Sequence, residues 1–277
     1  MFNGQYPVIS VCILAKNASA TLEKCLSSLV SFSEVILLDT GSEDMTIEIA
    51  KTYPNVKIHT SPFLGFGPLR NLASSIAVND WILALDSDEI LSPSLIHEIQ
   101  SLVLDADCAY SIPRHNYFQG KWIKGAGWHP DVVVRLYNKK RTCYLRQKVH
   151  ESVDTQNVRA IPLSSPILHT PYRSYSDFLK KMEHYSTLFA EEHCGKKSSS
   201  LYKAVSHSFF AFFKSYFLKK GCLQGGAGFI ISLYNAHTAF YKYLKLSEKN
   251  FAAKKESRSD EQEKEKGHPP HKKKNIF

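Results

Sequence analysis

The stretch WILALDSDEI (residues 81–90) is an apolar segment that runs directly into a cluster of carboxylates. Asp86, Asp88 and Glu89 crowd the point where a buried strand is expected to end. Like charges at this spacing repel and shift one another's pKa values, so the cluster is unfavourable unless a positive charge lies among them. The segment therefore predicts a buried strand over residues 80–86 and a cation at its carboxyl end.

The chain before this stretch alternates strand patterns with helix patterns. Strands are predicted for the apolar runs VISVCILAK (8–16), EVILLDTGS (34–42) and VKIHT (56–60), and helices for residues 19–30, 44–53 and 69–78. Ser19 is the expected N-cap of the first helix, and Ser42 or Asp44 that of the second. Successive strand–helix units imply parallel strands with right-handed crossovers. We therefore predict an α/β fold with a Rossmann-like, mostly parallel sheet flanked by helices, and a site at the carboxyl ends of its strands.

The rest of the chain has a different character. Short strands with Gly- and Pro-containing loops are predicted over residues 108–172, and helices over 175–246. Residues from 253 onward mix Lys, Glu, Ser and Pro with almost nothing to bury, which predicts disorder. We therefore expect a main domain over residues 1–195, a basic, aromatic helical region over 196–250 and a disordered charged tail over 251–277.

The net charge of +9 is unevenly distributed. Residues 1–195 carry 18 basic and 20 acidic residues, whereas residues 196–250 carry nine lysines and one acidic residue, Glu248. The six cysteines form no C-x-x-C pair, and the first six residues lack the basic start of a signal peptide. These features predict a protein of the reducing cytoplasm with a basic C-terminal third.

Asp39 and Asp86 each close a predicted parallel strand, so they are expected to open on the same crevice. The turn DTGSEDMT (residues 39–46) could accept hydrogen bonds from a base or ribose through Asp39, or could serve only as a helix cap. The DSDE cluster could likewise be a solvated turn. We favour a site for Mg²⁺ or Mn²⁺, because a hard cation held by one or two carboxylates leaves positions for water and for a nucleotide's phosphates.

Several motifs together resemble those of the family-2 inverting glycosyltransferases, which have a GT-A fold. They are D-T-G-S-x-D-x-T (39–46), G-F-G-x-x-R-N (65–71) and L-D-S-D-E (85–89). The chain is most similar to lipopolysaccharide core glycosyltransferases of the β-glucosyltransferase type. That subgroup shares AKN (15–17), NYFQGKW through GWHPDVVVRLY (116–137), VHESV (149–153) and LHTPYRSYSDFLKKMEHYS (168–186). The resemblance covers residues 8–246.

The resemblance implies an enzyme that moves a sugar from a nucleotide-sugar, a UDP-hexose, to a lipopolysaccharide-core or other lipid-linked acceptor. It makes residues 1–195 the catalytic domain and Asp88 the principal metal ligand. His169, in ILHTPYR, would be a later metal ligand, although a lone histidine is more often structural. The implied nucleotide-sugar-binding residues are Ala15, Asn17, Asp39 near the uracil or ribose, Arg70 near the diphosphate, and Asp86 on the ribose or metal.

One position departs from the family pattern. Ala18 stands where these proteins usually have an acidic residue after the Lys-Asn pair. Either Asn17 and backbone groups hold the nucleotide there, or the affinity for the nucleotide is reduced.

An inverting transfer needs a carboxylate that deprotonates the acceptor hydroxyl. Glu151 is the preferred base, because it follows His150 in the HE pair common in related enzymes. Asp131, in GWHPD, is the second candidate and could instead shape the acceptor pocket. An anionic acceptor could also meet four basic side chains, each of which could equally be a solvated surface charge: Lys121, Lys124, Arg135 and Arg173.

The region from Ser208 to Lys245 is rich in aromatic and basic residues but has no unbroken apolar run long enough to span a membrane. Two amphipathic helices that lie on an anionic membrane surface are the favoured interpretation, at the inner face of the cytoplasmic membrane. Simple packing onto the catalytic domain is the alternative. No recognised nucleic-acid-binding module accompanies the charge, so nucleic acid is not expected as a partner.

Other classes of protein fit the sequence less well. A nucleotidyltransferase would need a Gly-rich, basic loop after the first strand, which AKNASAT (15–21) lacks. A phosphatase would carry its D-x-D motif after the first strand rather than the fourth. A non-catalytic membrane-bound scaffold is favoured only by Ala18.

Overall fold

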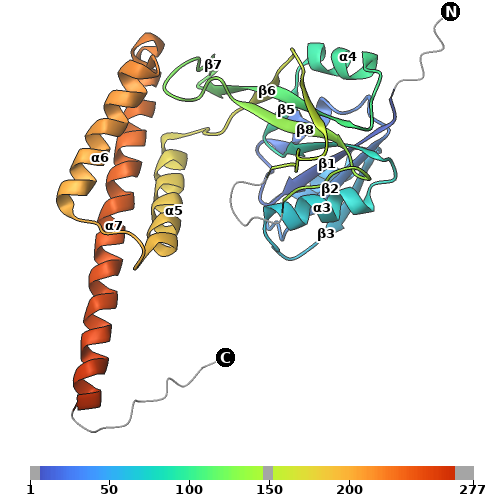
Figure 1. Ribbon diagram of the computed structural model, residues 1–277. Coiled ribbons are helices and arrows are strands. Elements are labelled where there is room, and N and C mark those ends of the chain that lie inside the picture. The colour runs from blue at the N-terminus through green and yellow to red at the C-terminus, as the bar shows by residue number, and fades with distance from the viewer. Residues whose placement is uncertain (1–6, 146–151, 266–277) are drawn as a thin grey trace, which may run out of the picture. The chain divides into compact units, whose positions relative to one another are not determined.

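The computed structural model describes residues 7–145 and 152–265 (Figure 1). The described chain forms two compact units. The first, here called the sheet unit, contains the chain up to Trp122 together with Trp128–Pro171. The second, here called the helical unit, contains Ile123–Gly127 and the chain from Tyr172 onward.

Four parallel strands form one half of the sheet, as the sequence predicts. They are β1 (Ile9–Ala15), β2 (Glu34–Asp39), β3 (Val56–Thr60) and β4 (Trp81–Asp86), in the order β3-β2-β1-β4. The register pairs Ala15 with Asp39, and Leu14 with Asp86. The carboxyl ends of β1, β2 and β4 therefore lie level at one edge of the sheet.

The other half of the sheet is mixed. Its strands are β5 (Glu89–Leu91), β6 (Cys108–Phe118), β7 (Lys121–Trp122), β8 (Val132–Asn138), β9 (Arg159–Pro162) and β10 (Ile167–His169). Strand β8 runs antiparallel to β4 and β6, which ends the parallel order. Strand β10 pairs with β6 and with β5, so that His169 lies beside both Asn116 and Glu89.

Helices cover both faces of the parallel strands: α1 (Leu22–Ser27), α2 (Thr46–Lys51), α3 (Phe66–Ile76) and α4 (Pro93–Ser101). Val11 and Ile13 point into one buried cluster with α1, whereas Cys12 points into the opposite cluster with α3. Successive side chains of a strand face opposite sides, and both sides are covered here. This explains why the strands read as continuous apolar runs.

The expected helix caps differ from those in the structure. The N-cap of α1 is Thr21, not Ser19, and that of α2 is Met45, not Ser42 or Asp44. The Asp44 carboxylate instead accepts hydrogen bonds from the Ser19 and Thr46 backbone N–H groups, each at 3.0 Å. The Asp44 carboxylate therefore binds the first N–H group of α2, as a capping side chain does, and also joins the start of this helix to the turn after β1.

The helical unit is built from α5 (Tyr175–His193), α6 (Leu201–Phe213), a π-helical turn (Lys214–Leu218), a 3₁₀ turn (Gly221–Gln224) and α7 (Gly226–Glu265). Helix α7 packs along both α5 and α6 (Figure 1). The predicted boundary at residue 195 therefore differs from the structure, which places α5 with the other helices. Among the described residues, none of the helices is long and apolar enough to cross a membrane.

The tail also differs from expectation, because α7 continues through residues 251–265 as one helix. Lys, Glu, Gln and Ala are strong helix formers, and a helix that is already nucleated extends through them at little cost. A polar composition therefore fits a solvated helix as well as a disordered chain. All six cysteines are free in the structure.

Candidate functional site

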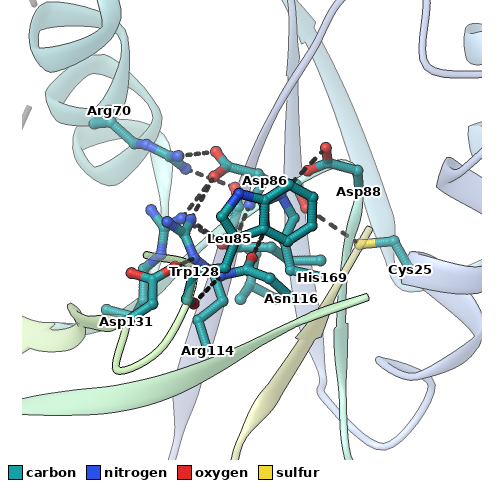
Figure 2. A network of polar contacts seen from close by, with 12 residues as sticks. Cys25, Arg70, Leu85, Asp86, Asp88, Arg114, Asn116, Trp128, Asp131 and His169 are labelled. Atoms are coloured by element: carbon teal, nitrogen blue, oxygen red, sulfur yellow. Dashed lines mark hydrogen bonds and ion pairs between the residues drawn. The ribbon is translucent and has the colours of Figure 1, made fainter. Parts of the chain in front are cut away.

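The positive charge that the DSDE cluster demands comes first from arginines. Asp86, at the end of β4, forms ion pairs with Arg70 of α3 and, at 2.6 Å, with Arg135 of β8 (Figure 2 shows the pair with Arg70). The Arg70 guanidinium also donates to the Leu85 carbonyl at 2.6 Å. The Arg70 guanidinium is therefore bound to the end of β4. Arg135 is a buried ion-pair partner rather than a solvated surface charge.

Glu89 is the second carboxylate of the network and its side chain is fully buried. One oxygen accepts from Arg135 at 2.6 Å and from Arg114 of β6 at 3.0 Å. The other oxygen accepts from the backbone N–H of Asp86 at 2.9 Å. Both oxygens are thus occupied, and Glu89 serves to hold the strand end and two arginines in place.

The arginines set the ionisation of Asp86. Loss of water around the carboxyl would raise its pKa, but the charges of Arg135 and Arg70 outweigh this effect and hold the pKa well below its usual range. Asp86 is therefore ionised at neutral pH.

Asp88 is the carboxylate of the cluster that faces no arginine among the described residues. Its Oδ2 atom lies 3.4 Å from Nε2 of His169, on β10. The two metal ligands that the resemblance implies are thus brought together (Figure 2).

Asn116 orients the His169 ring through a hydrogen bond to its Nδ1 atom. The Asn116 amide nitrogen donates to the Trp128 carbonyl at 3.0 Å and to Asp131 at 2.8 Å, so its oxygen faces His169 Nδ1 at 2.6 Å. An oxygen can only accept, so Nδ1 must carry the proton. Nε2 then faces the Asp88 carboxylate, and a metal ion between the two groups could be bound by both.

These two side chains suit a metal ion that keeps water and phosphate as its other ligands. The described residues contain no cluster of three or more His, Cys, Asp and Glu side chains arranged to hold a metal. A site here would therefore depend on oxygens from a bound substrate.

Asp131 lies within the same network. Its Oδ2 atom accepts from Arg114 Nε and from Asn116, both at 2.8 Å (Figure 2). Burial would raise the pKa of Asp131, but these donors hold it below its ordinary value. Glu151 and His150 lie outside the described residues.

The predicted nucleotide-binding residues line the level strand ends. The Asp39 carboxylate is buried and accepts from the N–H groups of Gly41 and Ser42, each at 2.9 Å, and from the Ser42 hydroxyl at 2.5 Å. The Ala15 carbonyl accepts from the Thr40 N–H at 3.0 Å. Asp39 thus shapes its own turn, and its contact with a base or ribose stays a prediction.

Asn17 joins the turn after β1 to the turn after β2. It has a left-handed φ of 51°, its N–H donates to the Ser42 hydroxyl, and its side-chain oxygen accepts from the Glu43 N–H, both at 2.8 Å. The Ala18 side chain is buried in the core, which explains why a small apolar residue fits there.

Three residues of this site are not predicted to belong to it from the sequence: Arg114, Asn116 and Tyr144. Asn71, next to Arg70, exchanges two 2.9 Å hydrogen bonds with the Tyr144 backbone, and the Tyr144 ring lies 5.7 Å from the Arg70 guanidinium carbon. A cavity of about 330 Å³ is lined by Asp86, Arg114, Arg135 and Tyr144, among others. The partners are far apart in the chain, so no local pattern reveals them.

Of the four basic residues proposed to meet an anionic acceptor, Arg135 alone is placed in this network. Lys121 lies on β7, whereas Lys124 and Arg173 belong to the helical unit. Their contact with an acceptor stays a prediction.

Comparison with known proteins agrees with this architecture. Residues 10–160 match the Glycosyl transferase family 2 domain. An uncharacterized glycosyltransferase of Rickettsia typhi is 30% identical, over 91% of this chain and 91% of its own. The lipopolysaccharide core biosynthesis glycosyltransferase LpsC of Rhizobium meliloti is 25% identical, over 87% of this chain and 93% of its own.

Among solved structures, the mannosyltransferase PcManGT of Pyrobaculum calidifontis, in complex with GDP-Man and Mn²⁺, has a similar fold. The TM-score is 0.50, at 12% identity over 89% of this chain and 87% of that one. The mixed α/β sheet with flanking helices is GT-A-like, and the chain belongs to glycosyltransferase family 2. The family and enzyme class predicted from the motifs are thereby confirmed.

The buried arginine–carboxylate network should dominate the stability of the sheet unit. Arg135→Met removes a partner of the fully buried Glu89, and an uncompensated buried charge costs about 3–5 kcal/mol. The matched control is Arg141→Met, which breaks an ion pair with Asp107 that is exposed on both sides and should cost less than about 1 kcal/mol. Urea unfolding followed by circular dichroism measures both, and similar losses in the two variants would contradict the assignment.

Proposed function

We propose that the protein is a metal-dependent inverting glycosyltransferase that moves a sugar from a nucleotide-sugar, a UDP-hexose, to a lipopolysaccharide-core or other lipid-linked acceptor. The observation that carries the proposal is the Asp88–His169 pair beside carboxylates already neutralised by arginines. Because Asp86 and Glu89 are occupied, Asp88 is the member of the cluster left to bind a cation.

The donor is proposed to bind along the level ends of β1, β2 and β4. Ala15, Asn17, Asp39 and Asp86 line this edge and would contact the nucleoside. Asp88 and His169 would hold Mg²⁺ or Mn²⁺, with the His169 ring oriented by Asn116. The cation, when bound, neutralises the charge that develops on the departing nucleoside diphosphate.

This arrangement changes the role proposed for Arg70. Its guanidinium is engaged by Asp86 and by the Leu85 carbonyl, so it acts on the donor through Asp86 rather than by direct contact with the diphosphate.

The acceptor class is supported by the relatedness to LpsC, which is described as a lipopolysaccharide core biosynthesis enzyme. The metal is supported by the donor atoms of Asp88 and His169. PcManGT, a protein of similar fold, was solved with GDP-Man and Mn²⁺.

Donor binding should depend on a divalent cation held at Asp88. Asp88→Asn weakens the negative charge at the cation and should lower the affinity for UDP in the presence of Mn²⁺ by about tenfold or more. Isothermal titration calorimetry with and without Mn²⁺ measures this.

The matched control is Asp80→Asn, just before the other end of β4, where Asp80 forms an exposed ion pair with Lys140. It should leave the affinity unchanged. A metal-independent wild type, or equal affinity in wild type and Asp88→Asn, would refute the metal site.

The base is proposed to be Glu151, with Asp131 shaping the acceptor pocket. A general base works best with a pKa near the operating pH, and the pKa of Asp131 is held low by Arg114 and Asn116. Glu151→Gln should lower turnover by about 10²-fold or more with nearly unchanged UDP-sugar binding. Asp131→Asn should mainly raise the KM for the acceptor. Steady-state kinetics with both substrates varied measures these effects. If Asp131→Asn lowered turnover and Glu151→Gln mainly raised the KM for the acceptor, Asp131 would be the base.

We further propose that the helical unit binds an anionic membrane surface at the cytoplasmic leaflet. Large apolar side chains are exposed along α6 and the turns that follow it: Phe209, Phe213, Phe217, Leu218 and Leu223. Lys214, Lys219 and Lys220 are exposed in the same turns. Aromatic residues beside lysines suit the interface of an anionic bilayer, where each lysine contributes about 1 kcal/mol.

Vesicle co-sedimentation tests this surface. The double variant Phe217→Asp/Leu223→Asp should lose binding to phosphatidylglycerol vesicles, because it places negative charge at the contact. Val103→Asp is the control, since Val103 is an apolar residue of the sheet unit that is more exposed than either Phe217 or Leu223. Equal binding of both variants, or equal wild-type binding to neutral phosphatidylcholine vesicles, would contradict the proposal.

A further inference from the structure

Residues Ile123–Gly127 belong to the helical unit although the chain on both sides of them belongs to the sheet unit. Trp122 is the last residue of β7, and Trp128 begins the loop that carries Asp131. The chain therefore leaves the sheet unit for five residues and returns just before the candidate site.

Both backbone groups of Ala126 are bound by the helical unit. Its N–H donates to the Lys219 carbonyl at 2.8 Å. Its carbonyl accepts from the Ser215 hydroxyl at 3.0 Å and from the Asn235 amide of α7 at 3.3 Å. Asn235 also donates to the Ser215 hydroxyl at 3.0 Å, so the two side chains act as one clamp.

The segment fits closely against the turns of the helical unit. A methyl group at Gly125 would lie 2.6 Å from the Lys220 carbonyl oxygen, so only glycine fits there without a shift. Ile123 and Ala126 are fully buried, as is Ser215 within the π-helical turn. A π-turn is uncommon and is frequently found at functional positions. Here it carries the hydroxyl that binds Ala126.

The loop that leaves this clamp is held at the candidate site by its other polar groups. The Trp128 carbonyl, one residue beyond Gly127, accepts from Asn116 at 3.0 Å. The backbone carbonyl of Asp131 accepts from the Arg114 N–H at 2.7 Å. The same Asn116 orients His169, so a shift of the loop would reach both Asp131 and the proposed metal ligand.

We propose that Ser215 and Asn235 are positioning residues for the transfer reaction. By holding Ala126 they restrain the backbone of the segment that continues directly into the loop over residues 128–131, which carries the Trp128 carbonyl and Asp131. The clamp is a property of the described structure, whereas its effect on turnover rests on the proposed function.

The test compares two asparagines of α7. Asn235→Ala removes the clamp. Asn250→Ala removes a similar pair of bonds, because Asn250 donates to the Lys197 carbonyl at 2.8 Å and accepts from the Gly195 N–H at 2.9 Å, away from residues 123–127. Three measurements are made on each full-length variant: hydrogen exchange over residues 123–131, turnover of a UDP-sugar, and UDP affinity by calorimetry.

Asn235→Ala should raise hydrogen exchange through residues 128–131 and lower kcat by about ten- to a hundredfold, because small misplacements of reacting groups cost this much. The affinity for UDP should stay within about twofold, since the donor edge is unchanged. Asn250→Ala should leave exchange over residues 123–131 and kcat unchanged, at a similar loss of thermal stability.

Two results would overturn the inference. One is an equal fall in kcat in the two variants, which would show general destabilisation. The other is unchanged exchange over residues 128–131 in Asn235→Ala. If the wild type transferred no sugar from any nucleotide-sugar, the proposed function would fail, and the exchange measurement would still decide whether the clamp holds the loop.

Discussion

The ionic network around Asp86 and Glu89 is the constraint on which the rest of the sheet unit depends. Glu89 has no exposed surface, so its charge is tolerable only with Arg114 and Arg135 in place. These two arginines come from β6 and β8, and Arg70 comes from α3. A single pair of carboxylates therefore requires one helix and three neighbouring parts of the sheet to meet with little freedom of position.

The arginines pair with two carboxylates of the DSDE cluster and leave the third without an arginine partner among the described residues. Asp86 and Glu89 hold the architecture, and Asp88, two positions after Asp86, is left with His169 as its partner. The same chemical group thus serves structure and proposed catalysis within four residues, and the difference lies in which neighbours the fold supplies. Neighbouring groups also determine the orientation of His169. The Trp128 carbonyl and Asp131 orient the Asn116 amide, and the oxygen of this amide in turn orients the His169 ring.

The sequence predicts the parallel half of the fold well, because each of its strands is buried on both faces and reads as an unbroken apolar run. It also predicts that a cation must accompany Asp86, but not that arginines supply the charge. Arg135 lies 49 residues from Asp86 along the chain and sits among valines like any strand residue. Tertiary pairing of this kind leaves no local pattern, and the same holds for Asn71 with Tyr144 and for the bond that Asp44, at the start of α2, accepts from Ser19.

The excursion of residues 123–127 has a consequence for how such enzymes can be divided or recombined. The helical unit includes an internal segment of the chain, although most of it follows the sheet unit in the sequence. A fragment ending at Pro171 would leave the Ala126 backbone groups without their partners and would expose the side chain of Ile123. Exchange of the C-terminal helices between related proteins would therefore have to carry this internal five-residue segment with it, so the two stretches are expected to change together.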